Sequence, residues 1–356
     1  MRILIVTDEY PPGRTGGIGV FYRDMATRLE QAGAQVRVVV TEQSASARPT
    51  DILRRRWDNF LAARKAAHSF APDVVETHDW AAPLTAAPWR PLVVRLHGAH
   101  TARHQKPSRF WRLLEGRALA AADARVAVSR WAADATAKAF GLRGEIPVIS
   151  SGIDTSTFRP PIVPRNGAEI LYVGSPRADK GVGDLIEAAD QVLARRADAQ
   201  LTIAGATESD VADWTGRMCD ASRARVRCLG RVPRYMLPAL YGRATLCVFP
   251  GRAEALGLAC LEAMATATPV IASLRGGAAE LIDHERSGLL VDPLQSGRLS
   301  AAISRLLDAP ERRREMGQAA RRRIVEDFDL KAVTARNLRF YENLCTRFVH
   351  PGRRAA

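Results

Sequence analysis

The stretch VFPGRAEALGLACLEAMATATPV, residues 248–270, carries two carboxylates at a spacing that local structure does not explain. Its apolar beginning predicts a buried strand, and residues 257–266 predict a helix after a short loop. Glu254 then lies on the loop and Glu262 on the helix. Because that helix is apolar on every side, we expect it to be buried with one carboxylate inside it. A buried carboxylate is costly unless a partner compensates its charge.

Two explanations fit this pattern. In the first, Glu262 is a core residue held by an arginine elsewhere in the chain, and Glu254 is an ordinary solvated charge. In the second, the two carboxylates belong together to one functional site. For either residue alone the first explanation is the better one, so the decision depends on their combination.

The combination is informative, because seven residues separate Glu254 from Glu262, Gly257 lies between them, and AMATATPV follows. It resembles the E-x7-E motif of the retaining, nucleotide-sugar-dependent glycosyltransferases of family 4, also called glycosyl transferases group 1. The resemblance implies an α/β fold of the GT-B type, with two Rossmann-like domains facing across a cleft and the donor bound mainly by the second. It also implies that Glu254 contacts hydroxyls of the donor sugar and that Glu262 contacts the nucleotide ribose.

The loop between the two carboxylates supplies further donor-binding candidates. The backbone N–H groups of Gly257 and Leu258, at the start of the predicted helix, suit a diphosphate because helix N-termini attract anions. By the same resemblance Leu256 belongs to the donor site, although the family usually has Phe at this position. Ala267 departs from the family's usual Gly, and neither change removes a polar group that would contact the donor.

Length and composition place the chain among ordinary globular proteins and allow two domains. It has 356 residues, of which 47% are hydrophobic and 25% charged. It contains no apolar run of membrane-spanning length, and its first residues predict a strand rather than a signal peptide. The five cysteines show no CxxC spacing, and we expect them to be reduced. We therefore expect a cytoplasmic protein, with peripheral contact to the inner face of the membrane as an open alternative.

Strands and helices alternate along the chain, which predicts parallel α/β sheets. The segment SGIDTSTFRPPIVPRNG, residues 151–167, is rich in Pro and polar residues and is the best domain linker, because the alternation restarts after it. We predict an N-terminal, acceptor-side Rossmann-like domain over residues 1–160 and a donor-binding Rossmann-like domain over residues 161–327. The tail, residues 328–356, resembles the family's C-terminal helix, which crosses back to the N-terminal domain.

The net charge of +14 is unevenly distributed. Basic residues exceed acidic ones in residues 1–160 and after residue 300, whereas the segment between them is neutral. A basic first domain suits nucleic acid, an anionic membrane surface or an acidic acceptor, but an Arg-rich composition without such a partner explains it equally well. Since the resemblance indicates sugar transfer, we expect no nucleic acid as a partner.

The loop after the first predicted strand has the sequence DEYPPGRTGGIGVF, residues 8–21, and opens a helix. Glycines let the backbone approach a ligand and direct N–H groups to an anion. The dinucleotide fingerprint is absent, because Tyr22 occupies the third glycine position, and a plain tight turn is the more common explanation. In the resembled family, however, this loop faces the donor phosphates, which makes Gly16 and Gly17 donor-binding candidates.

Polar residues follow two predicted strands of the first domain, where open α/β sheets bind ligands. By resemblance, His97 matches the family's histidine near the donor sugar and is a catalytic candidate. A metal site built from His97, His100 and His104 has a spacing that suits no common motif, so we predict no metal. His78 or Asp79, in the sequence THDW, is a candidate for the acceptor side.

Lys180 lies at the start of a predicted helix, where its charge opposes the positive end of the helix dipole. This placement indicates an anionic ligand, although a lysine that extends into solvent is the alternative. In the resembled family an Arg and a Lys both bind the diphosphate. Lys180 matches the lysine, but Ser175 occupies the position of the arginine, and Arg177 is the nearest substitute.

The turn at residues 230–233, in CLGRVPRYML, ends another predicted strand. In the resembled family the nucleotide base lies against this turn and contacts mainly backbone groups, so Val232 is a donor-binding candidate. Recognition by the backbone leaves no trace in the side chains, and the donor is therefore left open among UDP-, GDP- and ADP-linked sugars.

Together these features predict a retaining, hexosyltransferase-like glycosyltransferase that moves a sugar from a nucleotide-diphosphate sugar to an acceptor hydroxyl in glycan or glycoconjugate biosynthesis. By resemblance, the hydroxyl attacks from the face on which the diphosphate leaves, and His97, Lys180 and Glu254 carry the chemistry without a cofactor. Two alternatives come from other classes: a non-catalytic nucleotide-sugar binding protein and a nucleotide-sugar epimerase of the same GT-B fold. Product analysis separates the three.

The acceptor is a saccharide, another small metabolite or a lipid-linked intermediate. Two basic stretches with aromatic residues, at residues 52–70 and 106–117, favour contact with an anionic membrane surface and hence a lipid-linked acceptor. Their Trp, Leu and Phe spacing suits packing against the sheet equally well, and a soluble acceptor would then follow.

Overall fold

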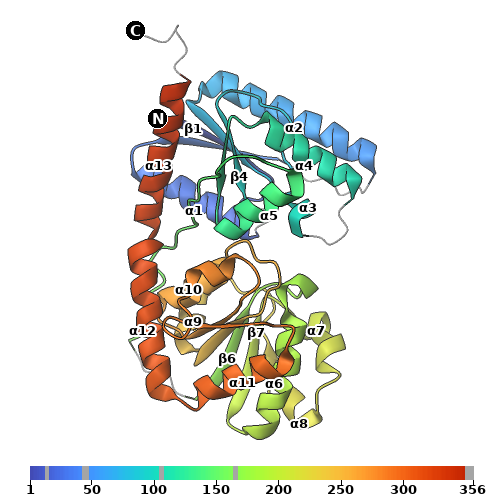
Figure 1. Cartoon of the computed structure of the whole chain (residues 1–356), viewed down its shortest axis with the longest axis vertical. Helices are drawn as coiled ribbons and strands as arrows, with labels where there is room; N and C mark the ends of the chain where they lie inside the picture. The colour runs from blue at the N-terminus through green and yellow to red at the C-terminus, as the bar shows by residue number, and fades with distance from the viewer. Residues whose placement is uncertain (13–15, 42–47, 104–107, 163–166, 349–356) are drawn as a thin grey trace. The chain divides into compact units, whose positions relative to one another are not determined.

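The computed structural model describes residues 1–12, 16–41, 48–103, 108–162 and 167–348 of the chain (Figure 1). The chain forms two compact units. The first consists of Met1–Gly152 and the chain from Leu330 onward, and the second of Ile153–Asp329. The chain thus leaves the first unit once and returns to it near its end.

The first unit is built on a five-stranded parallel sheet in the order β2-β1-β3-β4-β5. The strands are β1 (Arg2–Thr7), β2 (Gln35–Val40), β3 (Val74–His78), β4 (Leu92–Leu96) and β5 (Ala124–Ala127). The register pairs Ile3 of β1 with Val36 on one side and Val74 on the other. The strands β1, β3 and β4 each contain a run of consecutive apolar residues, as expected for a sheet that is covered on both faces.

Helices cover both faces of this sheet. They are α1 (Gly17–Gln31), α2 (Pro49–Phe70), α3 (His100–Arg103), α4 (Arg109–Ala121), α5 (Arg130–Phe140) and α13 (Leu330–Arg347). Ile5 packs with residues of α1 and α13 on one face, and Leu4 packs with α2 on the other. Leu96 of β4 packs with α4 and α5 on the same face as Leu4, because side chains alternate along a strand.

The last helix is fixed to the first sheet by a buried ion pair. Arg95 of β4 donates from Nε and Nη2 to the two carboxylate oxygens of Glu76 on β3, at 2.7 and 3.0 Å, and both side chains are inaccessible to solvent. From α13, Tyr341 donates to Glu76 at 2.6 Å, and the side-chain oxygen of Asn337 accepts from Arg95 at 2.6 Å. Since α13 also contacts α1, the predicted return of the C-terminal helix to the first domain is confirmed.

The second unit is built on a six-stranded parallel sheet in the order β11-β10-β9-β6-β7-β8. The strands are β6 (Ala168–Val173), β7 (Ala199–Ala204), β8 (Val226–Cys228), β9 (Leu246–Phe249), β10 (Val270–Ser273) and β11 (Leu289–Val291). No strand was predicted at β11, whereas β8, which is equally short, was predicted. The two parallel sheets with their covering helices confirm the predicted Rossmann-like architecture of both units.

The helices of the second unit connect these strands. Those before β10 are η1 (Ala178–Lys180), α6 (Val182–Arg195), α7 (Glu208–Thr215), α8 (Asp220–Arg223), η2 (Arg234–Met236), α9 (Leu237–Arg243) and α10 (Leu258–Ala265). Those after it are η3 (Gly277–Leu281), α11 (Ser296–Leu307) and α12 (Pro310–Asp327). Here η marks a 3-10 helix.

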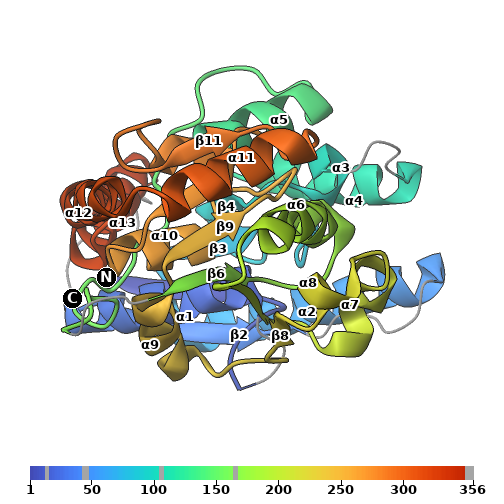
Figure 2. The same ribbon diagram turned by 90° about the horizontal axis from the view of Figure 1, so that it is seen from below.

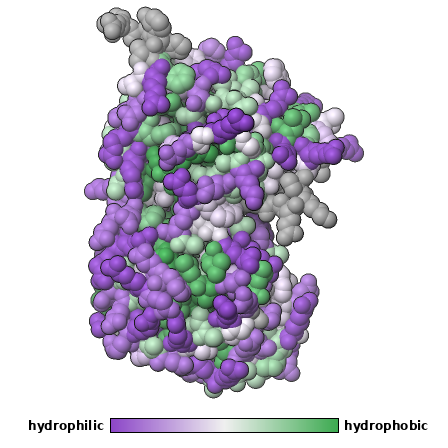
Figure 3. Space-filling model, in the orientation of Figure 1, coloured by the Kyte–Doolittle hydropathy of each residue, from purple (hydrophilic) through white to green (hydrophobic). Residues whose placement is uncertain are grey.

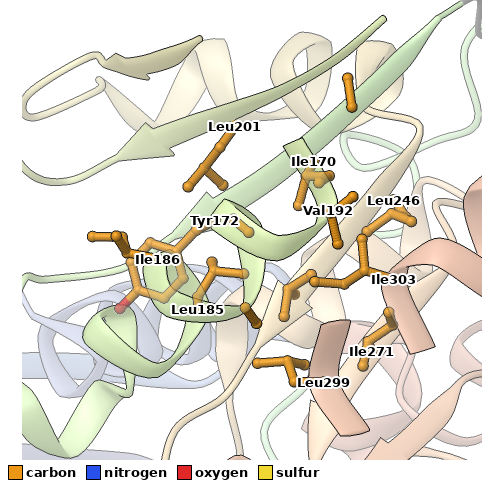
Figure 4. Close-up of a cluster of buried hydrophobic side chains, with 14 of the residues drawn as sticks. Ile170, Tyr172, Leu185, Ile186, Val192, Leu201, Leu246, Ile271, Leu299 and Ile303 are labelled. Atoms are coloured by element: carbon orange, nitrogen blue, oxygen red, sulfur yellow. The ribbon is translucent and has the colours of Figure 1, made fainter. Parts of the chain in front are cut away.

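The hydrophobic core of the second unit lies between its sheet and the pair α6 and α11, which run side by side (Figure 2). Figure 4 labels ten of its side chains: Ile170, Tyr172, Leu185, Ile186, Val192, Leu201, Leu246, Ile271, Leu299 and Ile303. The helix α10 packs against β9 and β10 and also contacts α9 and α12. The sheet thus fixes α10, which carries Glu262.

The chain enters the second unit at Ile153, whose N–H donates to the carbonyl oxygen of Phe328 at 2.9 Å. Arg321 of α12 donates to the carbonyl oxygen of Phe158 at 2.7 Å and so fixes the entering segment. Residues 151 and 152 of the predicted linker therefore belong to the first unit, and its described residues from Ile153 onward belong to the second. Residues 163–166 of that linker lie outside the described residues.

In the described ranges, no helix is long and apolar enough to cross a membrane. On the face shown in Figure 3, hydrophobic residues lie in areas scattered among hydrophilic ones. The exposed large apolar side chains include Leu53, Trp57 and Leu61, which follow one another at intervals of four residues on α2. This spacing places them on one side of the helix.

Candidate functional site

Both sheets contain a point at which the strand order reverses. In the second sheet β6, β7 and β8 follow one another in one direction, whereas β9, β10 and β11 lie on the other side of β6. Open α/β sheets bind ligands at the carboxyl ends of the strands that flank such a reversal. The loops after β6 and β9 therefore mark the candidate site of the second unit.

These two loops are packed backbone against backbone. The N–H of Arg252, after β9, donates to the carbonyl oxygen of Asp179, after β6, at 2.8 Å. Gly181 has a φ of +72°, and a Cβ there would collide with the carbonyl oxygen of Pro250. Only glycine fits this contact, because an added Cβ would meet main chain rather than a movable side chain.

Lys180 and Glu254 form an ion pair where the two loops meet. Lys180 ends η1, one residue before the N-cap of α6, and Glu254 lies in the loop between β9 and α10. Their side chains are 22% and 26% exposed, so solvent reaches both. The structure thus brings together two of the three residues that the sequence predicted to carry the chemistry.

The backbone of Glu254 is held by two glycines that follow β10. The N–H of Gly277 donates to the Glu254 carbonyl oxygen at 2.7 Å, and Glu254 forms an isolated parallel bridge with Gly276. Gly276 has a φ of +111°, and a Cβ there would stand 2.7 Å from the same oxygen. Burial, and after it the charge of Glu254, raises the pKa of Tyr172. The main chain of Glu254 is therefore held by the segment that contains Gly276 and Gly277.

The helix α10 begins beside the ion pair and is largely buried, as the sequence predicted. Gly257 is its N-cap, with a φ of +95°. Leu256 is buried, so a ligand could contact only its main chain. Gly257 and Leu258 place the N-terminus of the helix at the strand-order reversal, where its partial positive charge favours an anion.

Glu262, further along α10, is compensated within the second unit. It is nearly inaccessible to solvent, its Oε2 accepts from the Tyr241 hydroxyl at 3.0 Å, and its Oε1 lies 2.7 Å from Nη1 of Arg234. Burial, and after it this carboxylate, raises the pKa of Tyr241 well above its ordinary value. Arg234 is therefore the arginine that we expected if Glu262 is a core residue, and the burial of Glu262 does not by itself require a ligand.

Arg177 is engaged with an acidic neighbour. Its Nε donates to Asp179 at 2.8 Å, and this hydrogen bond raises the pKa of the guanidinium. Half of the Arg177 side chain is exposed. Arg177 is thus paired with Asp179, and Lys180 with Glu254.

The turn at residues 230–233 is tied to the ends of β6 and β7 through glycines. The N–H of Gly205 donates to the carbonyl oxygen of Gly230 at 2.7 Å. A Cβ on Gly205, whose φ is +106°, would collide with the carbonyl oxygen of Gly174. Val232 therefore lies at the carboxyl edge of the second sheet, shortly after the end of β8.

In the first unit the reversal falls between β1 and β3, and buried polar residues follow both strands. Oδ1 of Asp8 lies 3.1 Å from Nε2 of His78, and neither side chain is accessible to solvent. The N–H of His97, directly after β4, donates to Asp79 at 2.7 Å. The His97 ring packs edge-on against Phe21, with ring centroids 5.0 Å apart. His97 thus lies at the carboxyl end of its strand, in a fixed position.

The N-terminus of α1 already receives a carboxylate of the chain itself. Oε2 of Glu9 accepts from the N–H groups of Gly16 at 3.0 Å and Gly19 at 3.4 Å. A Cβ on Gly16 would collide with this oxygen, and one on Gly19 would stand 3.0 Å from the Glu9 main chain. The glycines therefore admit Glu9 to the start of the helix, whose first residue is Gly17.

Two histidines of the metal site that we weighed cannot be placed. His104 lies outside the described residues, and so does the side chain of His100. Within the part of the chain that the structure describes, no three His, Cys, Asp or Glu side chains are grouped so that they could hold a metal ion.

Sequence reasoning missed three residues of these sites. Arg234 and Tyr241 hold Glu262, yet Tyr241 is 21 residues away from it in the chain, and no local pattern connects them. Glu9 left a weak signal, because the glycines that follow it allow close approach of a carboxylate from the same chain as well as of a ligand.

Comparison with known proteins agrees with this geometry. The family described as "Glycosyl transferases group 1" matches residues 155–323, and the one described as "Glycosyltransferase Family 4" matches residues 15–157. The glycogen synthase of Mycobacterium tuberculosis is 31% identical over 396 residues, which cover 96% of this chain and 94% of that protein.

Solved structures share the fold over nearly the whole chain. Sucrose-phosphate synthase from Thermosynechococcus elongatus superposes with a TM-score of 0.83 at 21% identity, covering 98% of this chain and 100% of that one. HepE of Anabaena, in complex with UDP-glucose, superposes with a TM-score of 0.76 at 21% identity, covering 96% and 100%. These matches confirm the predicted GT-B fold. The chain therefore belongs to the family 4, or group 1, glycosyltransferases, retaining enzymes that transfer a sugar from a nucleotide sugar.

Proposed function

We propose that the enzyme binds a nucleoside-diphosphate hexose at the carboxyl edge of the second sheet, with the diphosphate beside Lys180 and the sugar beside Glu254. The observation that carries this proposal is their ion pair at the strand-order reversal. A partly exposed Lys–Glu pair offers a cation to phosphate and an acceptor to sugar hydroxyls. HepE was solved with UDP-glucose, which supports a UDP-linked hexose as the first donor to test, before GDP- and ADP-linked ones.

The charge that develops during transfer explains why a cation is needed at this place. As the bond from the anomeric carbon to the phosphate oxygen breaks, negative charge develops on the departing diphosphate; the acceptor oxygen bonds to that carbon, and the hydroxyl proton passes to the departing phosphate oxygen. Lys180 has three N–H donors, so it can contact a phosphate oxygen while one donor stays with Glu254. The N–H groups of Gly257 and Leu258 add the positive end of a helix. Because this charge develops in the transition state, its stabilisation by Lys180 raises the rate of turnover.

The remaining donor contacts follow the edge of the same sheet. We place the ribose beside Glu262, the base against the turn that contains Val232, and a phosphate beside the main chain of Leu256. Arg177 donates to Asp179 from Nε and Nη2, so its Nη1 can donate to a phosphate oxygen while that pair stays intact, and we keep Arg177 as a candidate for the diphosphate site. Lys180 and the backbone N–H groups of Gly257 and Leu258 are the main source of affinity for the phosphates.

In the first unit we assign His97 to the donor sugar and Gly16 and Gly17 to the diphosphate. The N–H of Gly16 is engaged with Glu9, so a phosphate would have to replace that carboxylate. Such an exchange substitutes one anion for another at the start of α1, where the helix N-terminus favours negative charge.

The two basic stretches with aromatic residues differ in the exposure of their apolar side chains, and the exposed side chains of α2 favour an acceptor in a membrane. Trp57 is 61% exposed between the exposed Leu53 and Leu61, and Arg64 and Lys65 are exposed on the same side of the helix. Apolar side chains flanked by cations suit an anionic lipid surface. We therefore propose that the enzyme meets a lipid-linked acceptor at the inner face of the membrane, through α2.

The other stretch, in α4, serves packing. Phe110 and Trp111 pack against a cluster that contains Ile52 and Leu114. A saccharide or another small soluble acceptor is thus the alternative if α2 does not bind lipid. Co-sedimentation with vesicles that contain or lack an anionic lipid decides between them, with Trp57→Ser as the variant. If the fraction of enzyme bound to vesicles depends neither on the anionic lipid nor on the Trp57→Ser substitution, the proposed membrane contact is ruled out.

Lys180→Ala tests the proposed donor site. We expect turnover to fall by about 10²- to 10³-fold, the usual effect of removing one group that stabilises charge in a transition state. Lys138→Ala, on an exposed position of α5, is the matched control and should leave turnover unchanged. The temperature of unfolding should be the same in both variants. Normal turnover in Lys180→Ala would refute the assignment.

Product analysis tests the reaction itself. Incubation with UDP-, GDP- and ADP-linked hexoses should give a new glycoside with the anomeric configuration of the donor. An isomeric nucleotide sugar would indicate epimerisation, and binding measured by calorimetry without any product would indicate a non-catalytic protein.

A further inference from the structure

The surroundings of Glu262 connect three separate elements of the second unit. Arg234 is the first residue of η2 and directly follows the turn at residues 230–233. Its Nη1 lies 2.7 Å from Oε1 of Glu262, while Tyr241 of α9 donates to Oε2 at 3.0 Å. Both oxygens of this carboxylate are therefore fixed by side chains from outside α10.

The Arg234 guanidinium is itself held in place. Its Cζ lies over the ring of Phe158, 5.2 Å from the ring centroid, and Phe158 is buried. Arg321 donates to the carbonyl oxygens of Phe158 at 2.7 Å and of Ala265 at 2.8 Å, which ties the segment that carries the ring to the end of α10. A planar guanidinium suits simultaneous contact with an aromatic face and a carboxylate, whereas an ammonium does not reproduce this geometry.

We propose that Arg234 is a positioning residue for the donor nucleotide, which holds Glu262 in the orientation that binds the ribose and couples that contact to the turn that meets the base. This inference rests on the proposed function, because it takes the ribose to lie beside Glu262. Arg234 itself need not touch the donor.

The physical argument has two parts. A carboxylate that is fixed at both oxygens keeps one orientation, so less conformational freedom is lost when ribose hydroxyls bind to it. Without the guanidinium, the buried carboxylate has lost its charge partner and rotates or takes up a proton, and in either state it accepts hydroxyl hydrogen bonds less well. Because Arg234 follows the turn in the chain, a shift of either element is transmitted to the other.

The test compares pairs of ligands that differ only in the ribose. Calorimetry gives the affinities of uridine, guanosine and adenosine diphosphates and of their 2′,3′-dideoxy forms for the wild type. For the base that binds most tightly, the ribo form should be preferred by on the order of tenfold or more, as expected for hydroxyls bonded to a charged group. Arg234→Met should reduce this preference to about threefold or less, and Arg234→Lys should give an intermediate value.

Three comparisons make the result decisive. Arg227→Met, an exposed arginine of β8 outside the turn that meets the base, should keep the full ribose preference. In kinetics, Arg234→Met should raise KM for the donor while kcat changes little, because the ribose contact is the same before and in the transition state. Should Arg234→Met fail to fold, Arg234→Lys, which keeps a positive charge beside Glu262, answers the same question.

Two outcomes overturn the proposal, and they are distinguishable. If Arg234→Met weakens ribo and dideoxy ligands equally, or Arg234→Lys keeps the full preference, the guanidinium does not position Glu262, while the donor site stands. If the wild type shows no ribose preference and Glu262→Gln changes neither affinity, the ribose does not meet Glu262, and the proposed placement of the donor fails as well.

Discussion

Replacing Arg95 by Met is expected to destabilise the first unit by about 3–5 kcal/mol, because it leaves a buried carboxylate without its charge partner. Arg95 and Glu76 are both inaccessible to solvent and are joined by two hydrogen bonds of 2.7 and 3.0 Å. Burial alone would lower the pKa of Arg95, but the charge of Glu76 outweighs it and raises the pKa above its ordinary value. The guanidinium therefore stays charged inside the core, two residues before His97.

Two further variants show that the cost comes from the unpaired charge. Tyr341→Phe removes one hydrogen bond to Glu76 and should cost about 1.5–3 kcal/mol, as expected for a bond to a charged group. Arg95→Met combined with Glu76→Leu removes both charges and should cost less than half of what Arg95→Met costs alone, since well-packed apolar side chains can replace a buried ion pair. Arg90→Met, an exposed arginine paired with Asp123, is the control and should cost less than about 1 kcal/mol.

Urea unfolding followed by tryptophan fluorescence measures these differences. The chain has six tryptophans, and Trp214 alone lies in the second unit, so a Trp214→Phe background reports on the first unit. A cost of less than about 1 kcal/mol for Arg95→Met would refute the argument, because a desolvated charge that loses its partner cannot be that well tolerated. Additive effects of Arg95→Met and Glu76→Leu would equally contradict it, since residues in one network are expected to couple.

Further outcomes follow from single contacts. Gly181→Ala should weaken nucleotide binding in calorimetry and lower the temperature of unfolding more than the control Gly167→Ala. Both glycines have a positive φ, but only a Cβ on Gly181 would collide with main chain. Equal effects of the two substitutions would contradict this. The hydrogen bond with Arg275 holds the pKa of Asp292 at about 2, and NMR titration of Arg275→Ala should show this pKa return toward 3.8. The stabilisation that the lowered pKa provides is present above about pH 4 and is lost as the pH falls toward 2. Cys260 is buried and burial raises its pKa, so a thiol reagent should modify Cys260 only in urea, whereas the exposed Cys219 should react in the native enzyme; mass spectrometry that finds Cys260 modified in the native enzyme would disprove this.

The secondary structure followed from the sequence where the pattern is local. Residues 2–7 and 92–96 form strands as predicted, and α10 lies within the predicted helix, because hydrophobic periodicity reports burial of neighbouring residues. Neither β11 nor α5 was predicted; β11 has three residues, and the buried residues of α5 are the small Ala132, Ala133 and Thr136. Short elements and small side chains bury little apolar surface, so they leave a weak pattern.

The sequence by itself determined the family, the two-sheet architecture and the kinds of group at the site: two carboxylates seven residues apart, a lysine at a helix start and glycines in loops. The tertiary structure alone decided which groups meet. Lys180 pairs with Glu254 across 74 residues of chain, and Arg234 and Tyr241 compensate Glu262. The physical reason is that periodicity and turn chemistry act between neighbours, whereas the meeting of distant charges depends on the order in which the strands pack.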